Sequence, residues 1–386
     1  MEDEDQDPLF HLILIRWVRG CAMKVTCDRP ALSDALAACT SIIASRTPKP
    51  ILQCIRVTAT KDELILTAYD QELGLRYRVS EVDTARPGET LVSGDRFFSI
   101  VRESVDESLA LEADNGTLHI RGRDSHFQIF GQDVRQFPPV VDLEGEPDLC
   151  LRADALQACI ERTTFAAARE STRYAINGVL WEKRAKRLQL VATDGRRLAR
   201  AGVSPEKSVG GDSDVIVPTK ALTTLSRLHV EPDAIIDVQL LPNQIIMRTP
   251  KATISSVLHD GHFPKYDDVI PKDCDKKLEI DAAEFLSAVK RAALLSTEET
   301  RGVRIAISSD GLVFSSRAPE QGEATIRQNA RYSGPNVEIG FNPTFLVEAL
   351  RVCSGAVSFE VKDGSKPGIL RCGPDFLYVV MPVNLS

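Results

Sequence analysis

The segment Leu149–Ala167, LCLRADALQACIERTTFAA, decides the fold because its pattern occurs three times in the chain. A short alternating strand runs into a helix there, and the same order appears at Met23–Ile43 and at Leu278–Leu295. The spacing is about 125 residues, far longer than the period of a solenoid repeat. The apolar positions that align across the three segments are Leu32, Leu156 and Phe285. A period of domain size indicates three tandem copies of one fold, which suits a curved or closed scaffold better than a single cleft.

A second helix follows in each copy. Its opening residues are GDRFF from Gly94, PTKAL from Pro218 and NPTFL from Asn342. The connections Pro138–Asp148 and Pro271–Lys277, which contain Pro and Asp, separate the copies. We therefore predict an extension and three domains, with the bounds 1–22, 23–147, 148–273 and 274–386.

Alternating apolar and polar residues mark the strands. Ile55–Ala59 and Leu64–Ala68 flank a polar turn and predict a hairpin. Asn115 and Gly116 lie between two alternating runs and predict another tight turn, because both residues tolerate positive φ. Each copy also has two segments with the apolar spacing of an amphipathic helix. The predicted fold class is α+β, with three tandem domains that each pack two helices on antiparallel sheets.

Composition bounds the possible functions. The chain has 386 residues and is 43% hydrophobic with few aromatics, so its cores must be mainly aliphatic. A net charge of −8 argues against a simple histone-like coat on DNA, although local basic stripes depend only on where charges lie. The nine Cys have no C-x-x-C spacing and the six His are scattered. This pattern predicts reduced thiols and no metal site or cofactor.

Residues 1–22 differ from the rest of the chain. An acidic head precedes the apolar run Leu9–Val18, which His11 and Arg16 interrupt. A secretory signal starts with basic residues, and a membrane span needs about 20 apolar residues, so neither fits. We expect a disordered extension or a misassigned start, with Met23 as the alternative start codon. The expected location is cytoplasmic, without a membrane partner.

Basic residues recur on the predicted helices, whereas acidic residues gather in strands, turns and connections. The helical basic set includes Arg96, Arg102, Arg162, Lys220, Arg227, Lys290, Arg291 and Arg351. If equivalent helices face one way, they form a basic surface that suits a phosphate backbone. Ordinary solvated helix faces would give the same pattern, and charge alone does not separate the two interpretations.

Several motifs together resemble one family. They are YAINGVL at Tyr174–Leu180, ATDGRRLA at Ala192–Ala199, DGHFPKY at Asp260–Tyr266, RAALLS at Arg291–Ser296 and YVVMPV at Tyr378–Val383. In this order they resemble the bacterial DNA polymerase III β subunit, the sliding clamp, and the similarity extends over the chain from Met23 onward. A lone Thr-Asp-Gly-Arg would be a weak signal, but the whole set is specific.

The resemblance implies a head-to-tail homodimer that forms a ring around double-stranded DNA, with helices lining the hole. It further implies partners that carry a clamp-binding peptide motif, namely the replicative polymerase, the clamp loader and other proteins. The clamp itself is not expected to be catalytic, whatever transferase label its holoenzyme carries. Dispersed Lys and Arg near phosphates, without a base-reading element, would let such a ring slide.

The family pattern also assigns site residues. The DNA-facing set is Arg46, Arg173, Tyr174, Lys220 and Asn342. The partner-peptide pocket is Ile176, Thr193, Gly195, Arg196, Arg197, Leu198, Pro264, Val269, Val379, Val380, Met381, Pro382 and Val383. The dimer interface is Phe127 and Ile129 of the first domain against Leu294 and Leu295 of the third domain of the partner subunit. Apolar pocket residues with an adaptable Met would accept a peptide that inserts a Leu-Phe pair.

Several positions depart from the family pattern, among them Ala175, where some relatives carry a second Tyr, and the less acidic segment Glu320–Glu323. Arg196 replaces a more usual His, and Asp268 stands where some relatives have Arg, so preference for charges beside the peptide motif is expected to change. Asp124 and His126 stand where basic residues are usual, which predicts weaker electrostatic closure of the ring.

Two other classes of function remain open from the sequence. A nucleotide- or sugar-processing enzyme on repeated α+β domains would need a nucleophile or paired carboxylates, and turnover assays would reveal it. Asp194 lies at a strand-to-turn junction, where Asp commonly caps its own backbone, and no catalytic motif accompanies it. A peptide-binding scaffold without DNA encirclement would keep peptide binding but lose retention on circular DNA.

Overall fold

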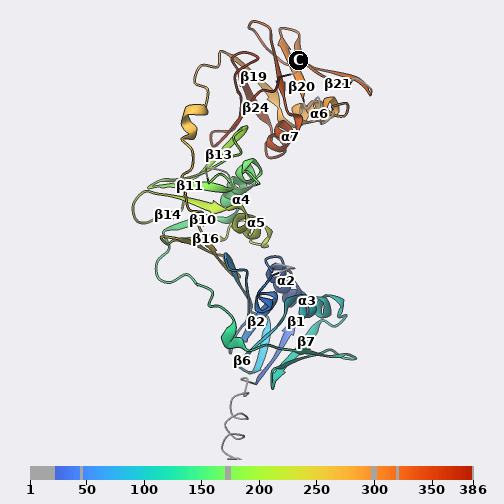
Figure 1. Cartoon of the computed structure of the whole chain (residues 1–386), viewed down its shortest axis with the longest axis vertical. Coiled ribbons are helices and arrows are strands. Elements are labelled where there is room, and N and C mark those ends of the chain that lie inside the picture. The colour runs from blue at the N-terminus through green and yellow to red at the C-terminus, as the bar shows by residue number, and fades with distance from the viewer. Residues whose placement is uncertain (1–21, 44–46, 170–174, 297–301, 319–320, 385–386) are drawn as a thin grey trace, which may run out of the picture. The chain divides into compact units, whose positions relative to one another are not determined.

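The computed structural model describes residues 22–43, 47–169, 175–296, 302–318 and 321–384. Its chain divides into two compact units. The first comprises Met1–Cys150 and Thr223–Val257, and the second comprises Leu151–Leu222 and Leu258–Ser386. Figure 1 labels helices and strands of both units.

The first unit contains a five-stranded antiparallel sheet in the order β5-β1-β7-β8-β9. Its strands are β1 (Met23–Asp28), β5 (Val82–Arg86), β7 (Ser108–Asp114), β8 (Thr117–Arg121) and β9 (His126–Phe130). Met23, Val25 and Cys27 point into the core, while Lys24 and Thr26 are exposed. The period-two pattern of the sequence thus gives this sheet one buried and one solvent face.

A second sheet of the first unit joins strands that are far apart in sequence. The order β16-β17-β18-β4-β3-β2-β6 is antiparallel throughout. The bounds are β2 (Cys54–Ala59), β3 (Leu64–Tyr69), β4 (Leu73–Val79), β6 (Gly88–Ser93), β16 (Ile235–Leu240), β17 (Gln244–Arg248) and β18 (Ala252–Val257). β18 pairs with β4 from Ala252 opposite Tyr77 to Ser256 opposite Leu73, so the predicted first and second domains share this sheet.

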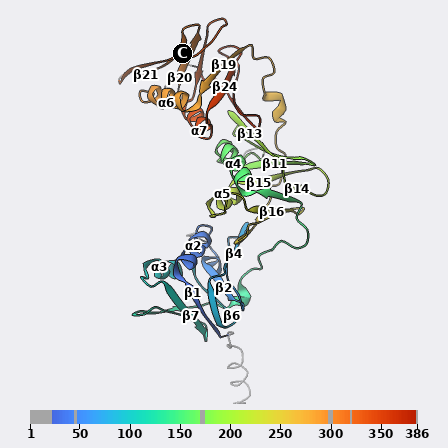
Figure 2. The same cartoon turned by 180° about the vertical axis from the view of Figure 1, so that it is seen from behind.

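Two helices cover the sheets of the first domain. α2 (Arg29–Thr40) and α3 (Gly94–Glu103) lie side by side, as Figures 1 and 2 show from opposite directions. Asp28 caps α2 by accepting a hydrogen bond from the Ala31 N–H at 2.9 Å. Leu32 and Phe97 are fully buried on the inner faces of the two helices. Two 3₁₀ turns, η1 (Pro50–Gln53) and η2 (Val134–Gln136), complete this part.

The second unit contains an eight-stranded sheet in the order β15-β11-β12-β13-β26-β25-β24-β19. The bounds are β11 (Gly178–Arg184), β12 (Arg187–Thr193), β13 (Arg197–Val203), β15 (Ser213–Pro218), β19 (Lys276–Asp281), β24 (Ala356–Val361), β25 (Gly368–Cys372) and β26 (Phe376–Val380). α4 (Ala153–Thr163) and η3 (Thr164–Ala166) contact β12 and β13. This sheet joins strands of the predicted second and third domains.

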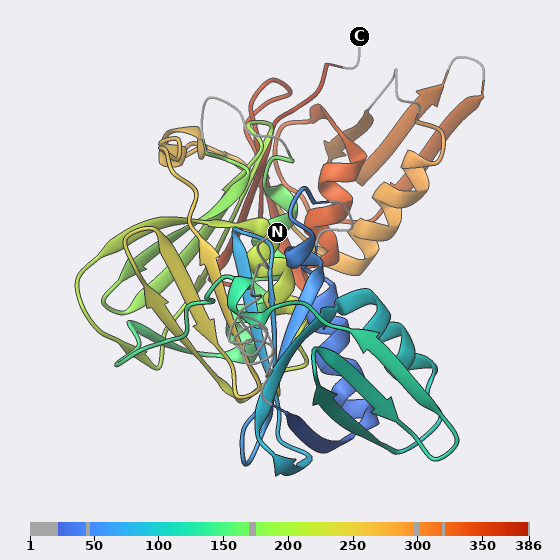
Figure 3. The same cartoon turned by 60° about the horizontal axis from the view of Figure 1, so that its bottom comes forward.

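A four-stranded sheet, β22-β21-β20-β23, completes the second unit. Its strands are β20 (Val303–Ser308), β21 (Gly311–Ala318), β22 (Gly322–Gln328) and β23 (Val337–Phe341). α6 (Ala282–Ala293) contacts β20, β21 and β22 and lies beside α7 (Pro343–Arg351), and Figure 3 shows both helices next to these strands. The remaining elements are β10 (Leu149–Arg152), β14 (Lys207–Ser208), α5 (Thr219–Arg227) and η4 (Tyr266–Val269).

The structure confirms the predicted α+β class and the pattern of the three copies. The aligned residues Leu32, Leu156 and Phe285 are each fully buried in the first helix of a copy. The predicted hairpin is β2–β3, and the Asn115-Gly116 turn has φ values of 48° and 77°. The hairpin β2–β3 followed by β4 is repeated as β11–β12–β13 and as β20–β21–β22. The strands β7–β8–β9 are repeated as β16–β17–β18 and as β24–β25–β26.

Candidate functional site

The turn between β12 and β13 is fixed by its own side chains. Gly195 has a φ of 84°, in the left-handed region that favours glycine. The Asp194 carboxylate accepts hydrogen bonds from the N–H groups of Arg196 at 2.9 Å and Arg197 at 3.1 Å. Thr193 Oγ1 donates to the Arg197 carbonyl at 2.6 Å and accepts from the Gly195 N–H at 3.1 Å. The predicted capping role of Asp194 is confirmed, and the turn exposes Arg196 to solvent.

Arg197 is an internal anchor of the second unit. Its side chain is only 9% exposed. The guanidinium pairs with Asp194 at 3.0 Å and with Glu348, donates to the Phe165 carbonyl at 2.7 Å, and lies 4.4 Å from the centre of the Phe345 ring. These partners belong to the β12–β13 turn, to η3 and to α7. The fork of Arg197 therefore joins elements of the second and third domains instead of presenting its charge to solvent.

β13 and β26 form the boundary between the strands of these two domains. The antiparallel register runs from Arg197 opposite Val380 to Ala201 opposite Phe376. Tyr378 is fully buried in β26, and its hydroxyl donates to the Phe345 carbonyl at 2.9 Å. We call this pairing the β13–β26 seam. The seam closes two sheet edges that would otherwise expose unpaired N–H and C=O groups.

The chain continues past the seam as an extended tail. The Met381 N–H donates to the Arg196 carbonyl at 2.9 Å, and the Val383 N–H donates to the Gly340 carbonyl at 2.8 Å. Pro382 lies between these two anchors. A depression of about 580 Å³ borders the tail and is lined by Arg304, Glu338, Ile339, Gly340, Gly364, Ser365, Pro382, Val383 and Asn384. The backbone hydrogen bonds fix the direction in which Met381 leaves the sheet.

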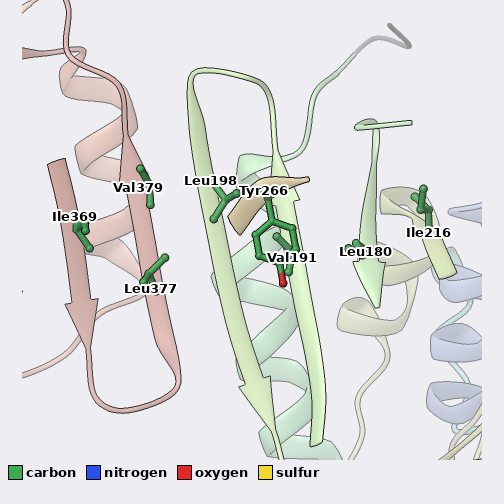
Figure 4. Close-up of a cluster of buried hydrophobic side chains, with 8 residues drawn as sticks. All are labelled: Leu180, Val191, Leu198, Ile216, Tyr266, Ile369, Leu377 and Val379. Atoms are coloured by element: carbon green, nitrogen blue, oxygen red, sulfur yellow. The ribbon is translucent and has the colours of Figure 1, made fainter. Parts of the chain in front are cut away.

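A buried apolar cluster adjoins the seam. Its members are Leu180, Val191, Leu198, Ile216, Tyr266, Ile369, Leu377 and Val379. Figure 4 shows that β25 and β26 supply three of them, whereas Leu198 and Val191 come from β13 and β12, with Tyr266 beside them. Ala175, Phe263, Ile270 and Cys274 are partly buried around the cluster.

Tyr266 attaches the connection before β19 to the central sheet. Its hydroxyl donates to the Glu182 carboxylate at 2.6 Å and accepts from the Gln189 amide at 2.8 Å. Burial, together with the hydrogen bond to Glu182, raises the pKa of Tyr266 above its ordinary value. The hydroxyl consequently stays protonated and remains a donor. Tyr266 begins the 3₁₀ turn η4, and Val269, which ends this turn, is exposed.

Apart from the anchor Arg197, the predicted pocket residues divide into two groups. Ile176, Thr193, Leu198, Val379 and Val380 are buried and support the site from within. Exposed or half-exposed positions are Gly195, Arg196, Pro264, Val269, Met381, Pro382 and Val383. Large apolar side chains are usually covered, and Val269 and Met381 are among the exceptions, with exposed fractions of 53% and 43%.

Sequence reasoning missed several contributors. Phe165, Phe345 and Glu348 surround the Arg197 guanidinium. None of these three residues lies in the motifs that assigned the pocket. Phe263, by contrast, lies in the DGHFPKY motif and packs edge-on against Tyr266, with ring centres 6.4 Å apart. An aromatic residue inside a quoted motif could have been included on that ground.

The predicted DNA-facing residues are described only in part. Arg46, Arg173 and Tyr174 lie outside the described residues. Lys220 is exposed in the first turn of α5. Asn342 caps α7, and its side-chain oxygen accepts a hydrogen bond from the Thr344 N–H at 3.0 Å. The described members thus lie at the beginning of the second helix of their respective domains.

The predicted interface residues lie in both units. In the first unit, Phe127 of β9 is 41% exposed, whereas Ile129 is buried in its own domain. An apolar hollow of about 320 Å³ lies between α3 and β9, lined by Ser99, Ile100, Glu103, Ser104, Val105, Asp106, Asp124, Ser125 and Phe127. In the second unit, Leu294 follows α6 and is 78% exposed, and Leu295 is half-buried.

The described residues contain no group of three or more His, Cys, Asp or Glu side chains that could hold a metal ion. Eight cysteines fall in the described part of the chain, and none of these eight is in a disulfide bond. None of the described helices has the length and apolar character needed to cross a membrane.

Three family models cover nearly the whole chain. The N-terminal, central and C-terminal domain models of the DNA polymerase III beta subunit match residues 23–142, 150–265 and 267–384. Three tandem clamp domains joined by shared sheets define a protein of the DNA clamp class.

Curated relatives and solved structures agree with the family models. The beta sliding clamps of Pseudomonas putida and Escherichia coli K12 are each 32% identical, over 94% of this chain and 100% of theirs. The sliding clamp (DNA polymerase III subunit beta) of Pseudomonas aeruginosa, solved bound to griselimycin, has a TM-score of 0.88 at 32% identity, again over 94% and 100%. The sliding clamp of Bacillus subtilis has a TM-score of 0.89 at 25% identity with the same coverage.

The chain belongs to the DNA polymerase III beta subunit family, the beta sliding clamps. Its function is that of the sliding clamp in DNA replication, a processivity factor that has no catalytic activity of its own.

Proposed function

We propose that two copies of the chain close head to tail into a ring around double-stranded DNA and tether the replicative polymerase to it. The observation that carries this proposal is a strand pairing that occurs twice within the chain. β4 of the first domain pairs with β18 of the second, and β13 of the second pairs with β26 of the third. In both cases the third strand of one copy meets the last strand of the next.

Applied to all three copies, the same rule leaves two strands at sheet edges that can pair between subunits. β22 is the third strand of the third domain, and β9 is the last strand of the first. Both stand at the ends of their sheets in the described part of the chain. Repetition of the rule pairs β22 of one subunit with β9 of the other in an antiparallel arrangement. Such a head-to-tail contact either closes into a ring or grows into a fibre, and two copies of a three-domain chain close it with six domains.

The side chains beside the two edges complement each other. The apolar hollow between α3 and β9 includes Phe127, Ile100 and Val105, and Val105 is 85% exposed. Leu295 lies beside Gly322, the first residue of β22, and the preceding residue Leu294 is exposed. We infer that Leu294 of one subunit enters the hollow of the other. Ile129 is buried in the core of its own domain, so it would take part in the contact between subunits through its backbone.

DNA would occupy the hole of the ring, near the predicted residues Arg46, Arg173, Tyr174, Lys220 and Asn342. Lys220 supplies an exposed positive charge at a helix N-terminus, and the helix dipole there also favours a phosphate. Neither feature reads base edges, so binding would depend on salt and not on sequence.

The peptide site would be the exposed surface around Met381 and Val269. Three remote segments support this assignment: Thr193–Leu198, Pro264–Val269 and Val379–Val383. Their backbones are held by the seam, by Arg197 and by Tyr266, so little ordering cost would fall on the clamp. A flexible Met beside a stiff Pro382 suits short apolar motifs from several partners in exchange. The polymerase, the clamp loader and other proteins with such a motif are the proposed partners, in the cytoplasm.

Sedimentation and imaging test the ring directly. Sedimentation velocity at micromolar concentration should give twice the chain mass of 42.4 kDa, and negative-stain class averages should have a central hole. Retention on circular DNA, with release after the circle is cut, should follow from encirclement. A stable monomer, or equal retention on cut and uncut DNA, would reject the proposal.

A further inference from the structure

Two histidines face each other on the solvent side of the first-domain sheet. His119 lies in the middle of β8, and His126 begins the neighbouring strand β9. Their rings are stacked, with centres 5.3 Å apart and planes inclined by 25°. Nδ1 of His119 lies 3.1 Å from Nε2 of His126, within hydrogen-bonding distance, so a metal ion bound by both nitrogens would replace the proton between them. His126 is exposed and His119 is half-buried, so solvent reaches the pair.

The distance between the two nitrogens is close to the distance between two neighbouring ligand atoms around a metal ion. Two imidazole nitrogens at metal distances of about 2.1 Å and 3.1 Å from each other subtend an angle of about 95° at the metal. This value is close to the right angle between neighbouring ligands in tetragonal Cu²⁺ and Ni²⁺ sites, and it is narrower than a tetrahedral angle. Both rings would turn so that their lone pairs converge, and the broad torsion between Cβ and an imidazole permits that rotation.

The neighbours on the same sheet face are of mixed charge. Glu112 of β7 lies directly opposite His119, and Gln128 of β9 lies opposite it on the other side. Arg121 of β8 lies opposite His126, and its positive charge opposes a bound cation. Glu112 offsets that charge across the sheet. Because the described residues hold no cluster of three metal ligands, water would complete the coordination sphere.

We propose that His119 and His126 form a surface site for a divalent transition metal ion of the Cu²⁺ or Ni²⁺ type. The two ligands come from adjacent strands whose register is fixed by β-sheet hydrogen bonds, so only the two side chains have to turn to chelate the ion. The site lies on one domain of one subunit, and it does not require the ring or DNA.

Cu²⁺ added to the full chain, with thiols blocked by N-ethylmaleimide, tests the site. Electron paramagnetic resonance should show one tetragonal Cu²⁺ per chain with hyperfine structure from imidazole nitrogen. His119→Gln and His126→Gln should each weaken that binding at least tenfold while the circular dichroism spectrum stays unchanged. His229→Gln, which removes an exposed histidine from another part of the chain, is the matched control and should bind Cu²⁺ normally.

Titration calorimetry with Ni²⁺ and Zn²⁺ tests the geometry separately. The cis angle predicts that Ni²⁺ binds at least as tightly as Zn²⁺. Three results would overturn the site: no Cu²⁺ binding by the wild-type chain, binding that survives in the double variant His119→Gln/His126→Gln, or equal loss in His229→Gln.

Discussion

The β13–β26 seam and the outer edge of β9 differ in what covers them. At the seam, each strand finds its partner within the chain, and Tyr378 and Val380 are fully buried beside the pairing. At β9, no further strand follows in the described residues, and Phe127 and Phe130 are 41% and 82% exposed. A sheet edge with apolar exposed side chains is usually a place for another strand. The same strand-to-strand contact would therefore join domains within a subunit and subunits within the proposed dimer.

The anchoring residues sharpen this contrast. Arg197 holds the seam from three sides with hydrogen bonds and ion pairs that involve Asp194, Glu348 and Phe165. The hollow beside the β9 edge exposes mainly apolar surface, although Glu103, Asp106 and Asp124 are among the residues that line it. A permanent seam would be held by such an anchor, whereas a contact that must open for DNA to enter would depend on weaker apolar packing. Four measurements can break or refine the comparison.

The largest effect is expected at the seam anchor. Arg197→Met keeps the side-chain volume but leaves the carboxylate of Glu348 and the Phe165 carbonyl without their partner. We expect the free energy of unfolding to fall by about 3–5 kcal/mol, as measured by urea denaturation of the full chain. Arg196→Met, at an exposed position in the same turn, should change it by about 0.5 kcal/mol or less. Equal effects of the two substitutions would show that Arg197 is not the anchor.

The second effect concerns the edge between subunits. Phe127→Glu and Leu294→Glu should each raise the dimer dissociation constant by roughly 100-fold or more, because each lost apolar contact occurs twice in the ring and is worth about 1.5–3 kcal/mol. Analytical ultracentrifugation across a dilution series measures this constant. Val141→Glu, with the same exposed fraction as Phe127, is the control and should leave the dimer unchanged. Dimers of normal strength in both interface variants would separate the β9 edge from ring closure.

The third effect tests the exposed surface beside the seam. Met381→Asp should weaken binding of a fluorescent peptide with the Gln and Leu-Phe motif by about tenfold or more, because it removes an apolar contact and adds a charge. Fluorescence anisotropy measures the affinity, and sedimentation should show an intact dimer. The control Val141→Asp should bind the peptide like the wild-type chain. Unchanged affinity in Met381→Asp would move the peptide site elsewhere.

The smallest effect is expected from a single DNA-facing charge. Lys220→Ala should reduce the slope of log K against log salt concentration by about one, without any change in sequence preference. Binding to open duplex DNA at several salt concentrations provides the slope. Lys61→Ala removes an exposed charge from the β2–β3 turn and serves as the control. An unaltered slope for Lys220→Ala would remove this residue from the DNA-facing set.

Local patterns account for the parts that could be predicted from the sequence. Asn115 and Gly116 encode their turn through their own φ preferences, and Asp194 caps the turn that it begins. Leu32, Leu156 and Phe285 were recognised as equivalent because helix periodicity repeats in all three copies. Arg197 was assigned to the pocket by family resemblance, but its partners Phe345 and Glu348 are about 150 positions away in sequence, and no local pattern identifies them.

The sequence by itself determined the tandem α+β domains, the family and most of the segments that contribute to the candidate sites. These features depend on residue types and spacing within a segment. Only the tertiary structure decided which side chains are covered: Val379, Val380 and Ile129 are buried, and Met381 is exposed. Strand alternation shows which side chains of a strand share one face of the sheet. Long-range pairing, such as that of β13 with β26, decides which edge of a sheet remains open.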